Sequence, residues 1–423
     1  MGFILYIKRR IPSGVRGFLF MAIVDTDKKR LTRITTAPLL TPYLRAEVEA
    51  LGFVVQDEDA VGVHVGATLG ECARLCLHLR TGMHVMWLLK RFRCPSPKAL
   101  YRHVASFPWE ELIDRAGYFS VSSSVDNPKI TNSMYPNLVV KDAIVDRISK
   151  QMGERPDSGP DKSKVVINLY WKGERAWLYL NVNGRRLADR GYRRMPHSAP
   201  MQETLAAGVL ACAGYDGSQT LVNPMCGAGT IAIEAALIAS GRAPGLLRSN
   251  FSFMHTKLFD EDSWKTMRIE AKKSGNRGIR HGENGGGGGG DGGGKRIIAS
   301  DHDERAMYAA RKNAATAGVE HLIEFVQCDF ADTPIPEGEA GMIIMNPEYG
   351  NRLGEIEELT KTYGLIGDFF KKRCAGWSGF VFTGNRELAK KIGLRASRRV
   401  PFVNAKIDCR LLEYEMYAGS LRE

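Results

Sequence analysis

The sequence lacks the features of a membrane protein and of a disulfide-linked secreted protein. No apolar run among its 423 residues approaches the roughly 20 residues that a membrane-spanning helix needs. Its eight cysteines form no Cys-x-x-Cys pair and no Cys/His cluster with the spacing of a zinc site. We therefore expect a reduced, cytoplasmic protein that has no metal site, no structural disulfides and no membrane contact.

Acidic residues are missing from residues 1–24, which carry Lys8, Arg9, Arg10 and Arg16. A targeting peptide is one interpretation of such a stretch, and a start site at Met21 is another. The apolar runs between the basic residues are short and interrupted. We therefore expect a disordered basic extension, which we place at residues 1–34.

The net charge is +12, and its distribution along the chain is uneven. Residues 1–200 hold 31 Lys and Arg against 19 Asp and Glu, whereas the remaining residues hold 28 of each. A basic half beside a neutral half indicates a polyanion-binding module joined to a second module. Scattered, solvated basic side chains are the alternative explanation.

The hydrophobic pattern divides the chain into three folded parts. Residues 35–95 and 96–194 mix helical and strand periods, which predicts two small α+β units. From residue 195 to 423 strands and helices alternate, which predicts a parallel sheet covered by helices. The expected strands of this part lie at 220–223, 296–300, 323–327, 341–345, 379–383 and 410–416. A segment at about 242–295, with glycine tracts at 285–290 and 292–294, interrupts the alternation, and we expect a flexible insert there.

A glycine turn follows the first of these strands, in the sequence Asn-Pro-Met-Cys-Gly-Ala-Gly-Thr at 223–230. Gly227 and Gly229 let the backbone approach a ligand and leave the amides of the next helix free to hold an anionic group. The pattern is shorter than Gly-x-Gly-x-x-Gly, since Ala232 occupies the third position. A nucleotide-like cofactor and a tight structural turn both remain open from this segment alone.

Acidic residues follow the next two strands. Asp301 stands where a carboxylate commonly holds a ribose diol, and Asp303 either shares that contact or caps the following helix. Asp329, after the third strand, either accepts a hydrogen bond from an adenine amino group or is an ordinary loop residue. Glycines and acids at successive strand ends favour a cofactor site more strongly than any one of them does.

The segment Asn-Pro-Glu-Tyr-Gly at 346–350 ends the fourth strand and has the pattern of a clamp for a flat amine. The Asn346 side-chain oxygen and the Pro347 carbonyl can accept both hydrogens of one NH2 group, and Tyr349 offers a face for an extruded base. We infer methyl transfer from S-adenosylmethionine to an exocyclic base nitrogen, a reaction that depends mainly on alignment. Cys226 and Cys328 have no basic neighbour in sequence, so we interpret both as wall residues and not as nucleophiles.

The chain resembles the RlmL family, the THUMP-domain methyltransferases that form N2-methylguanosine in 23S rRNA. The resemblance covers about residues 35–416 and is carried by the segments 140–147, 184–193, 200–206, 223–230, 310–313 and 346–354. It implies a ferredoxin-like N-terminal domain, a THUMP RNA-binding domain over 96–194 and a Rossmann-like class I methyltransferase domain. The chain departs from the family pattern at Glu348, where proline is usual, and at Asn223, where aspartate is usual.

These inferences predict an RNA (guanine-N2-)-methyltransferase that uses S-adenosylmethionine and acts in rRNA processing. We expect the amine clamp at Asn346, Pro347 and Tyr349. We expect cofactor contacts at Asn223, Gly227, Gly229, Asp301, Asp329 and, more weakly, Glu203. We expect RNA contacts at Arg190, Arg193 and Arg194, for which a solvated linker is the alternative. Methylation of a tRNA guanosine or of an adenine amine, and a non-catalytic RNA-binding or assembly factor, are the competing functions.

Overall fold

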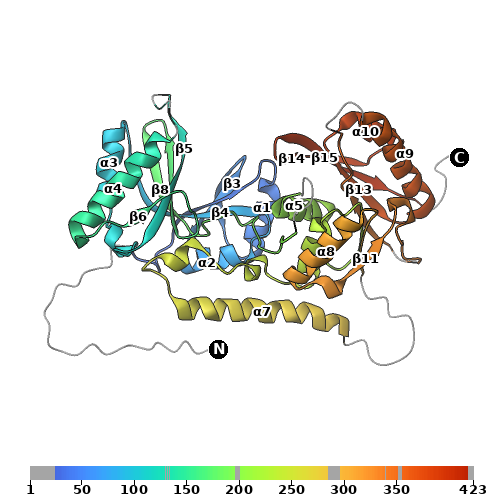
Figure 1. Cartoon of the computed structure of the whole chain (residues 1–423), viewed down its shortest axis with the longest axis horizontal. Coiled ribbons are helices and arrows are strands. Elements are labelled where there is room, and N and C mark those ends of the chain that lie inside the picture. The colour runs from blue at the N-terminus through green and yellow to red at the C-terminus, as the bar shows by residue number, and fades with distance from the viewer. Residues whose placement is uncertain are drawn as a thin grey trace.

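The computed structural model describes residues 24–128, 130, 132, 134–195, 201–283, 296–338, 340–350 and 355–417. Each half of the chain is built around one sheet, and the two sheets lie in separate lobes (Figure 1). Helix α7 (Glu261–Glu283) runs along the lower side of the view in Figure 1. Within the described residues, no helix combines the length and the apolar character that crossing a membrane requires.

The first half contains an eight-stranded sheet with the order β2-β3-β1-β4-β8-β7-β5-β6. Its strands are β1 (Arg30–Thr36), β2 (Val55–Asp59), β3 (Gly62–Ala67), β4 (Gly82–Arg93), β5 (Tyr118–Asp126), β6 (Asp157–Ser158), β7 (Val165–Lys172) and β8 (Arg175–Asn181). Strands β1 to β4, with α1 (Thr41–Ala50) and α2 (Leu69–His78), follow the βαββαβ order of a ferredoxin-like unit. The remaining strands carry α3 (Pro97–Ala105), η1 (Trp109–Glu111) and α4 (Tyr135–Met152).

One expected boundary in this half is wrong, and the two expected units are joined in a way that was not expected. Strand β1 begins at Arg30, so the last part of the expected extension belongs to the sheet. The two α+β units expected at 35–95 and 96–194 share one sheet, because β4 pairs with β1 through its first residues and with β8 through its last ones. A strand of 12 residues is long enough to serve both neighbours. Residues 1–23 lie outside the described part of the chain.

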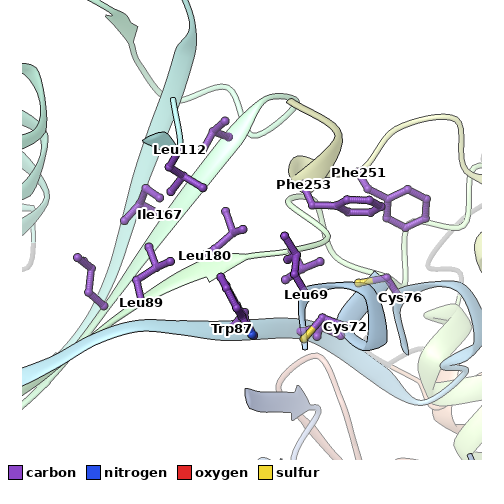
Figure 2. Close-up of a cluster of buried hydrophobic side chains, with 14 of the residues drawn as sticks. Leu69, Cys72, Cys76, Trp87, Leu89, Leu112, Ile167, Leu180, Phe251 and Phe253 are labelled. Atoms are coloured by element: carbon purple, nitrogen blue, oxygen red, sulfur yellow. The ribbon is translucent and has the colours of Figure 1, made fainter. Parts of the chain in front are cut away.

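The insert expected to be flexible is folded up to residue 283. It forms η2 (Pro244–Leu247), η3 (Ser252–His255) and α7, and it buries Phe251, Phe253 and Trp264 in the core of the first half. Figure 2 shows Phe251 and Phe253 close to Cys76 of α2. Three large aromatic side chains therefore fix this part of the insert, and only the glycine tract falls outside the described residues.

The second half contains a seven-stranded sheet with the order β11-β10-β9-β12-β13-β15-β14. The strands are β9 (Thr220–Pro224), β10 (Ile297–Asp301), β11 (Ile323–Gln327), β12 (Gly341–Met345), β13 (Ser378–Thr383), β14 (Arg398–Asn404) and β15 (Ile407–Glu415). The helical elements are α5 (Glu203–Ala213), α6 (Thr230–Ala239), α8 (Glu304–Ala317), η4 (Glu320–Leu322), η5 (Phe330–Asp332), α9 (Glu355–Arg373) and α10 (Arg386–Lys391). The five strands from β9 to β13 are parallel, whereas β15 is antiparallel to β13 and β14 to β15.

The expectation of a Rossmann-like α/β domain is confirmed, and β14 is a strand that the sequence pattern did not predict. The strand order reverses between β9 and β12, which are hydrogen-bonded neighbours. In a sheet of this kind, the crevice at the carboxyl ends of the strands on either side of the reversal is the usual ligand site. The glycine turn follows β9 and the 346–350 segment follows β12, so both predicted parts of the site leave the sheet at this reversal.

Candidate active site

The glycine loop connects β9 to α6 with three residues in the left-handed region. Met225 and Gly227 both have φ of 54°, and Gly229 has φ of 80° at the N-cap of α6. A Cβ atom at Gly227 would meet no atom within 4 Å, whereas one at Gly229 would lie 3.0 Å from the Cβ of Ala310. Gly229 therefore allows α6 to pack on α8, and Gly227 presents bare backbone to open space.

Asp301 ties the second strand end to this loop. Its Oδ2 accepts a hydrogen bond from the Gly227 amide at 2.9 Å, and its Oδ1 accepts one from the Asp303 amide at 3.0 Å. A carboxylate has lone pairs for about four hydrogen bonds, so acceptor capacity remains for a diol. Asp303 caps α8 by accepting from the Arg305 amide at 2.9 Å, which resolves the two alternatives for this residue in favour of the cap.

Asp329 lies at the third strand end, exposed to solvent. Its Oδ1 accepts from the Ala331 amide at 2.9 Å, which makes Asp329 the cap of η5. This bond fixes the carboxylate beside the end of β11 without burying it. The carboxylate therefore keeps acceptor capacity for the predicted hydrogen bond from an adenine amino group.

Asn223 bridges the two strands at the reversal. Its Nδ2 donates to the Ile344 carbonyl of β12 at 2.7 Å, and the side chain is only 1% exposed. Its Oδ1 is buried and has no hydrogen-bond partner in the described part of the chain. An unpaired buried acceptor is costly, and a ligand N–H group would satisfy it. This orphaned oxygen and the open space at Gly227 are the two features that fit a cofactor at this edge.

Asn346 and Tyr349 are joined directly. The Tyr349 hydroxyl donates to the Asn346 Oδ1 at 2.7 Å, which restrains the orientation of the amide. The Tyr349 ring lies 6.4 Å from Phe382, and burial raises the pKa of its hydroxyl. Tyr349 is half-buried in this state, so positioning Asn346 is a role that sequence reasoning did not assign to it.

Neighbouring side chains hold the loop after β12. The Tyr363 hydroxyl donates to the Glu348 carbonyl at 3.1 Å, and the Asn385 amide donates to the Tyr349 carbonyl at 3.0 Å. The Pro347 side chain is buried and the Glu348 side chain is exposed. Residues 351–354, which complete the 346–354 segment, lie outside the described part of the chain.

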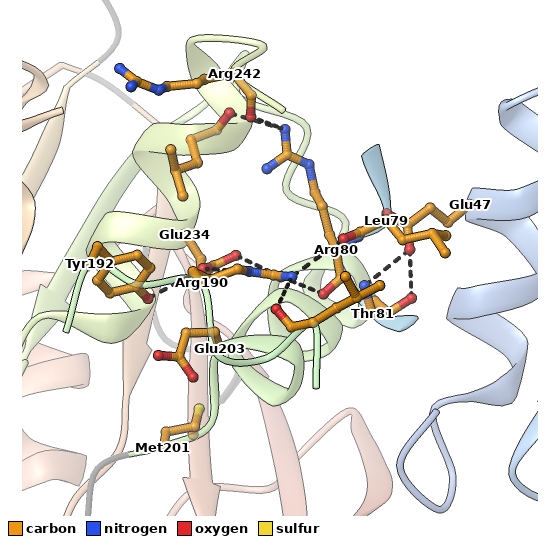
Figure 3. A network of polar contacts seen from close by, with 12 residues as sticks. Glu47, Leu79, Arg80, Thr81, Arg190, Tyr192, Met201, Glu203, Glu234 and Arg242 are labelled. Atoms are coloured by element: carbon orange, nitrogen blue, oxygen red, sulfur yellow. Dashed lines mark hydrogen bonds and ion pairs between the residues drawn. The ribbon is translucent and has the colours of Figure 1, made fainter. Parts of the chain in front are cut away.

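The expected RNA contact at Arg190 is wrong, because this side chain is 1% exposed. Figure 3 shows Arg190 directed at Glu234 and at the main chain of Leu79 and Arg80. Its Nη2 lies 3.3 Å from the Glu234 Oε2, and Tyr192 donates to the same carboxylate at 3.2 Å. Burial opposes the charge of Arg190, yet the facing carboxylate raises its pKa. Arg190 therefore joins the two halves of the molecule from within.

Arg193 connects the segment between the two halves to Glu203 of α5 and to the start of α6, next to the glycine loop. Arg193 pairs with Glu203 at 3.2 Å and donates to the Thr230 hydroxyl at 3.3 Å. Burial raises the pKa of Glu203, and the charge of Arg193 opposes that shift. Arg194 is exposed, so of the three arginines it keeps the expected RNA contact most readily.

Asn313 of α8 is a residue that sequence reasoning placed in a motif without giving it a role. Its Oδ1 accepts from the Arg194 and Met195 amides at 3.0 and 3.1 Å, and its Nδ2 donates to the Ala228 carbonyl at 3.3 Å. Its position could have been found from helical spacing, since it falls on the buried stripe of α8 that includes Ala306, Ala310 and Ala317. A polar residue on such a stripe needs partners.

The cysteines near the site have the properties of wall residues. Burial raises the pKa of the Cys226 thiol, and the nearby Asp301 carboxylate raises it further. Burial likewise raises the pKa of Cys328. A protonated thiol is a weak nucleophile, so neither residue is suited to attack a base carbon. All eight cysteines of the chain are free thiols.

Comparisons with known proteins give the family to which the chain belongs. The family model described as "RMKL-like, methyltransferase domain" matches residues 190–413, and a THUMP domain model matches residues 95–181. The ribosomal RNA large subunit methyltransferase K/L of Syntrophotalea carbinolica is 36% identical over 389 residues, which are 90% of this chain and 53% of that protein. The chain thus spans about half the length of the curated relatives it matches.

Solved structures share the architecture over nearly the whole chain. A Listeria monocytogenes protein described as a predicted N6-adenine-specific DNA methylase is 27% identical, with a TM-score of 0.79 over 95% of this chain and 99% of that one. SMU.472, a methyltransferase crystallised with SAH, is 24% identical, with a TM-score of 0.78 over 93% of this chain and 100% of that one. The latter likeness concerns the fold alone. With a matched domain that covers half of its length and a THUMP domain before it, the chain belongs to the RMKL-like methyltransferase family.

Proposed function

We propose that the protein transfers a methyl group from S-adenosylmethionine to the exocyclic N2 of a guanosine in RNA, with 23S rRNA as the preferred substrate. The observation that supports this proposal is that β9 and β12 are hydrogen-bonded neighbours. Asn346 therefore follows one strand end, next to the strand end that carries the orphaned Asn223 oxygen and the bare Gly227 backbone. The names of the matched relatives specify different nucleic acids, rRNA and DNA. Methylation of a base is compatible with both.

The residues present fit S-adenosylmethionine at this edge. We assign its amino acid portion to Asn223 and the Gly227–Gly229 backbone, its ribose to Asp301 and its adenine to Asp329. When bound there, the cofactor supplies an electrophilic methyl group on a sulfonium. Glu203 forms an ion pair with Arg193, which donates a hydrogen bond to Thr230. In this proposal Glu203 therefore acts indirectly, by positioning Arg193 at the start of α6.

The chain's own contribution to the reaction is alignment. Asn346 Oδ1, fixed by the Tyr349 hydroxyl, keeps a lone pair for one hydrogen of the base amine, and the Pro347 carbonyl accepts the other. Both bonds reduce the conjugation of the amine with its ring and direct its lone pair. Holding reactants in this way supplies a large part of the rate enhancement in a transfer that needs no strong base before attack.

Deletion of the gene and mass spectrometry of digested rRNA and tRNA test the substrate. The proposal predicts that N2-methylguanosine is lost from 23S rRNA and returns when the purified chain and S-adenosylmethionine are added to that RNA. Loss from tRNA alone, or loss of N6-methyladenosine, would move the assignment to one of the competing substrates. An unchanged nucleoside profile, together with no binding of labelled S-adenosylmethionine, would favour the non-catalytic alternative.

A cytoplasmic location is part of the same proposal. It is supported by the eight free thiols, which persist most readily in a reducing compartment.

A further inference from the structure

The eight-stranded sheet has two faces of different character. On β7, Val165, Ile167 and Leu169 belong to the core that includes residues of α3 and α4. Because side chains alternate along a strand, Asn168 and Tyr170 lie on the opposite face. Figure 1 shows α3 and α4 together on one side of this sheet. We call the other side, defined by Arg91, Arg93, Tyr170, Arg175 and Trp177, the aromatic–arginine face.

One row of this face crosses four adjacent strands. The strand register pairs Ser124 of β5 with Tyr170 of β7, Tyr170 with Trp177 of β8, and Trp177 with Arg91 of β4. The Tyr170 and Trp177 rings are 5.4 Å apart between centroids. The Arg91 guanidinium lies 5.5 Å from the centre of the Trp177 ring. The Arg33 guanidinium lies 5.9 Å from the centre of the Tyr170 ring, so two half-buried aromatic rings stand side by side with a cation near each of them.

The charges beside this row favour an anionic partner. Arg91, Arg93 and Arg175 are all exposed, and with Phe92 and Glu174 they line a hollow at the end of the β4–β8 ladder. Glu174 is paired with Arg93 at 2.9 Å. The hollow therefore contains three guanidinium groups and one carboxylate. Its net charge is positive, and it lies next to the two rings.

We propose that the aromatic–arginine face binds single-stranded RNA, with an unpaired base stacked on Trp177 or Tyr170 and phosphates held by Arg91 and Arg175. This inference rests on the proposed function, in which RNA is the substrate. Aromatic rings on an open sheet face accept the faces of unpaired bases, and arginines beside them hold the backbone. A duplex covers its base faces by internal stacking, so this surface selects single strands.

The experiment is a fluorescence titration of the full-length protein with a 12-nucleotide single-stranded RNA that contains one 2-aminopurine. Trp177→Leu should weaken binding by roughly 5- to 30-fold, because one base stack contributes about 1–2 kcal/mol. Arg91→Ala should weaken binding and reduce the slope of log K against log salt by about one. Trp177→Phe should keep most of the affinity, which separates loss of a ring from damage to the fold.

Arg102→Ala is the matched control, since Arg102 is exposed on α3, which packs on the other face of the sheet. It should bind the 12-mer as the wild type does, and a blunt-ended RNA duplex, which has no unpaired base, should not distinguish Trp177→Leu from the wild type. Equal affinity of wild type, Trp177→Leu and Arg91→Ala for the 12-mer would overturn the proposal, as would an equal loss in Arg102→Ala. The titration contains no cofactor, so it measures RNA binding independently of methyl transfer. If Trp177→Leu weakens RNA binding but the wild type transfers no methyl group, only the proposed function is contradicted.

Discussion

In the proposed function, Gly227 is the residue whose backbone conformation affects cofactor binding most directly. Its φ of 54° lies in the left-handed region, and the space beyond its Cα is open. Gly227→Ala should weaken S-adenosylmethionine binding by about tenfold or more, because the new methyl group fills that space and left-handed alanine costs roughly 1–2 kcal/mol. Isothermal titration with the cofactor measures this change.

Gly173→Ala provides a control with the same strain. Gly173 has the same φ of 54° and equally open surroundings, but it lies in the turn between β7 and β8. It should lose stability to a similar extent and bind the cofactor normally. Equal cofactor affinity of the two variants would show that the Gly227 backbone does not face the cofactor.

His84 predicts a specific pH dependence of stability. Burial lowers the pKa of its imidazole from 6.5 to about 4. Its Nδ1 also lies 3.2 Å from the side-chain amides of Asn181 and Asn183, which donate to the neutral ring. Between pH 6.5 and about 4 the unfolded chain binds the proton that the folded protein refuses. The contribution of His84 to the free energy of unfolding should therefore be constant above pH 6.5. It should fall by up to about 3 kcal/mol as the pH decreases from 6.5 to about 4.

Urea unfolding at pH 7 and pH 5 measures the His84 contribution. His84→Gln should be less stable than wild type at pH 7, and the difference should shrink at pH 5. A difference that is independent of pH would contradict a neutral, half-buried His84.

Individual residues at strand ends could be predicted because a polar residue directly after an apolar strand has a defined position. Asp301 and Asn346 were found in this way. Arg190 could not be predicted correctly, since its partner Glu234 is 44 residues away inside the apolar helix α6. A cluster of arginines in the sequence indicates a basic segment, but it does not indicate which of the side chains are buried.

At the scale of elements, α8 links the glycine loop to the segment between the two halves through Asn313. Asn313→Asp keeps the acceptor for the Arg194 and Met195 amides but loses the donor to the Ala228 carbonyl. An unsatisfied carbonyl facing a carboxylate should disturb the loop by about 1–3 kcal/mol. We expect cofactor affinity to fall by about tenfold while the helical content stays unchanged.

Thr316→Ala is the control for this helix, because Thr316 is exposed and bonds only to the Lys312 carbonyl one turn away. It should leave cofactor affinity unaltered. If Asn313→Asp lowers thermal stability without changing cofactor affinity, Asn313 has a structural role and no positioning role.

The parallel strands of the second half could be predicted because each is a short apolar run followed by a turn signal. Strand β14 escaped prediction, since it carries exposed Arg398 and Arg399 and contains Pro401, features of an edge strand that weaken its pattern. Strand β1 escaped because its basic residues were attributed to the extension. Edge and basic strands thus lack the hydrophobic signal on which sequence reasoning depends.

At the scale of the whole molecule, a polar network fixes one half against the other. Arg80 donates from the end of α2 to the carbonyls of Leu237 and Arg242 at 3.1 and 2.9 Å. Arg190 donates in the reverse direction to the Arg80 carbonyl at 2.5 Å (Figure 3). The two halves of the molecule are therefore joined through buried hydrogen bonds.

Arg190→Met tests this junction. It leaves the Glu234 carboxylate buried without its cation, which should reduce the free energy of unfolding by about 3–5 kcal/mol. Denaturant unfolding measures the loss. The double variant Arg190→Met with Glu234→Met should recover a large part of it, whereas additive losses would show that the two residues do not act as a pair.

The relation between the two halves could not be predicted from the sequence. The insert after α6 returns to the first half and places Phe251 and Phe253 in its core, a contact across some seventy residues from β8 that no local pattern reports. The glycine tracts of the insert favoured the prediction of a flexible segment, and the aromatic residues before them were given no role. Long-range packing of this kind is determined by which surfaces meet, and that information is distributed over the whole chain.

The most direct test of the account is a comparison of methyl transfer and cofactor binding in Asn346→Ala. The account predicts that transfer of labelled methyl groups to 23S rRNA falls by at least about a thousandfold, since alignment supplies most of the catalysis, while S-adenosylmethionine affinity stays within about twofold of wild type. Retained transfer, or loss of cofactor binding in parallel with transfer, would contradict the claim that Asn346 holds the amine opposite the methyl donor.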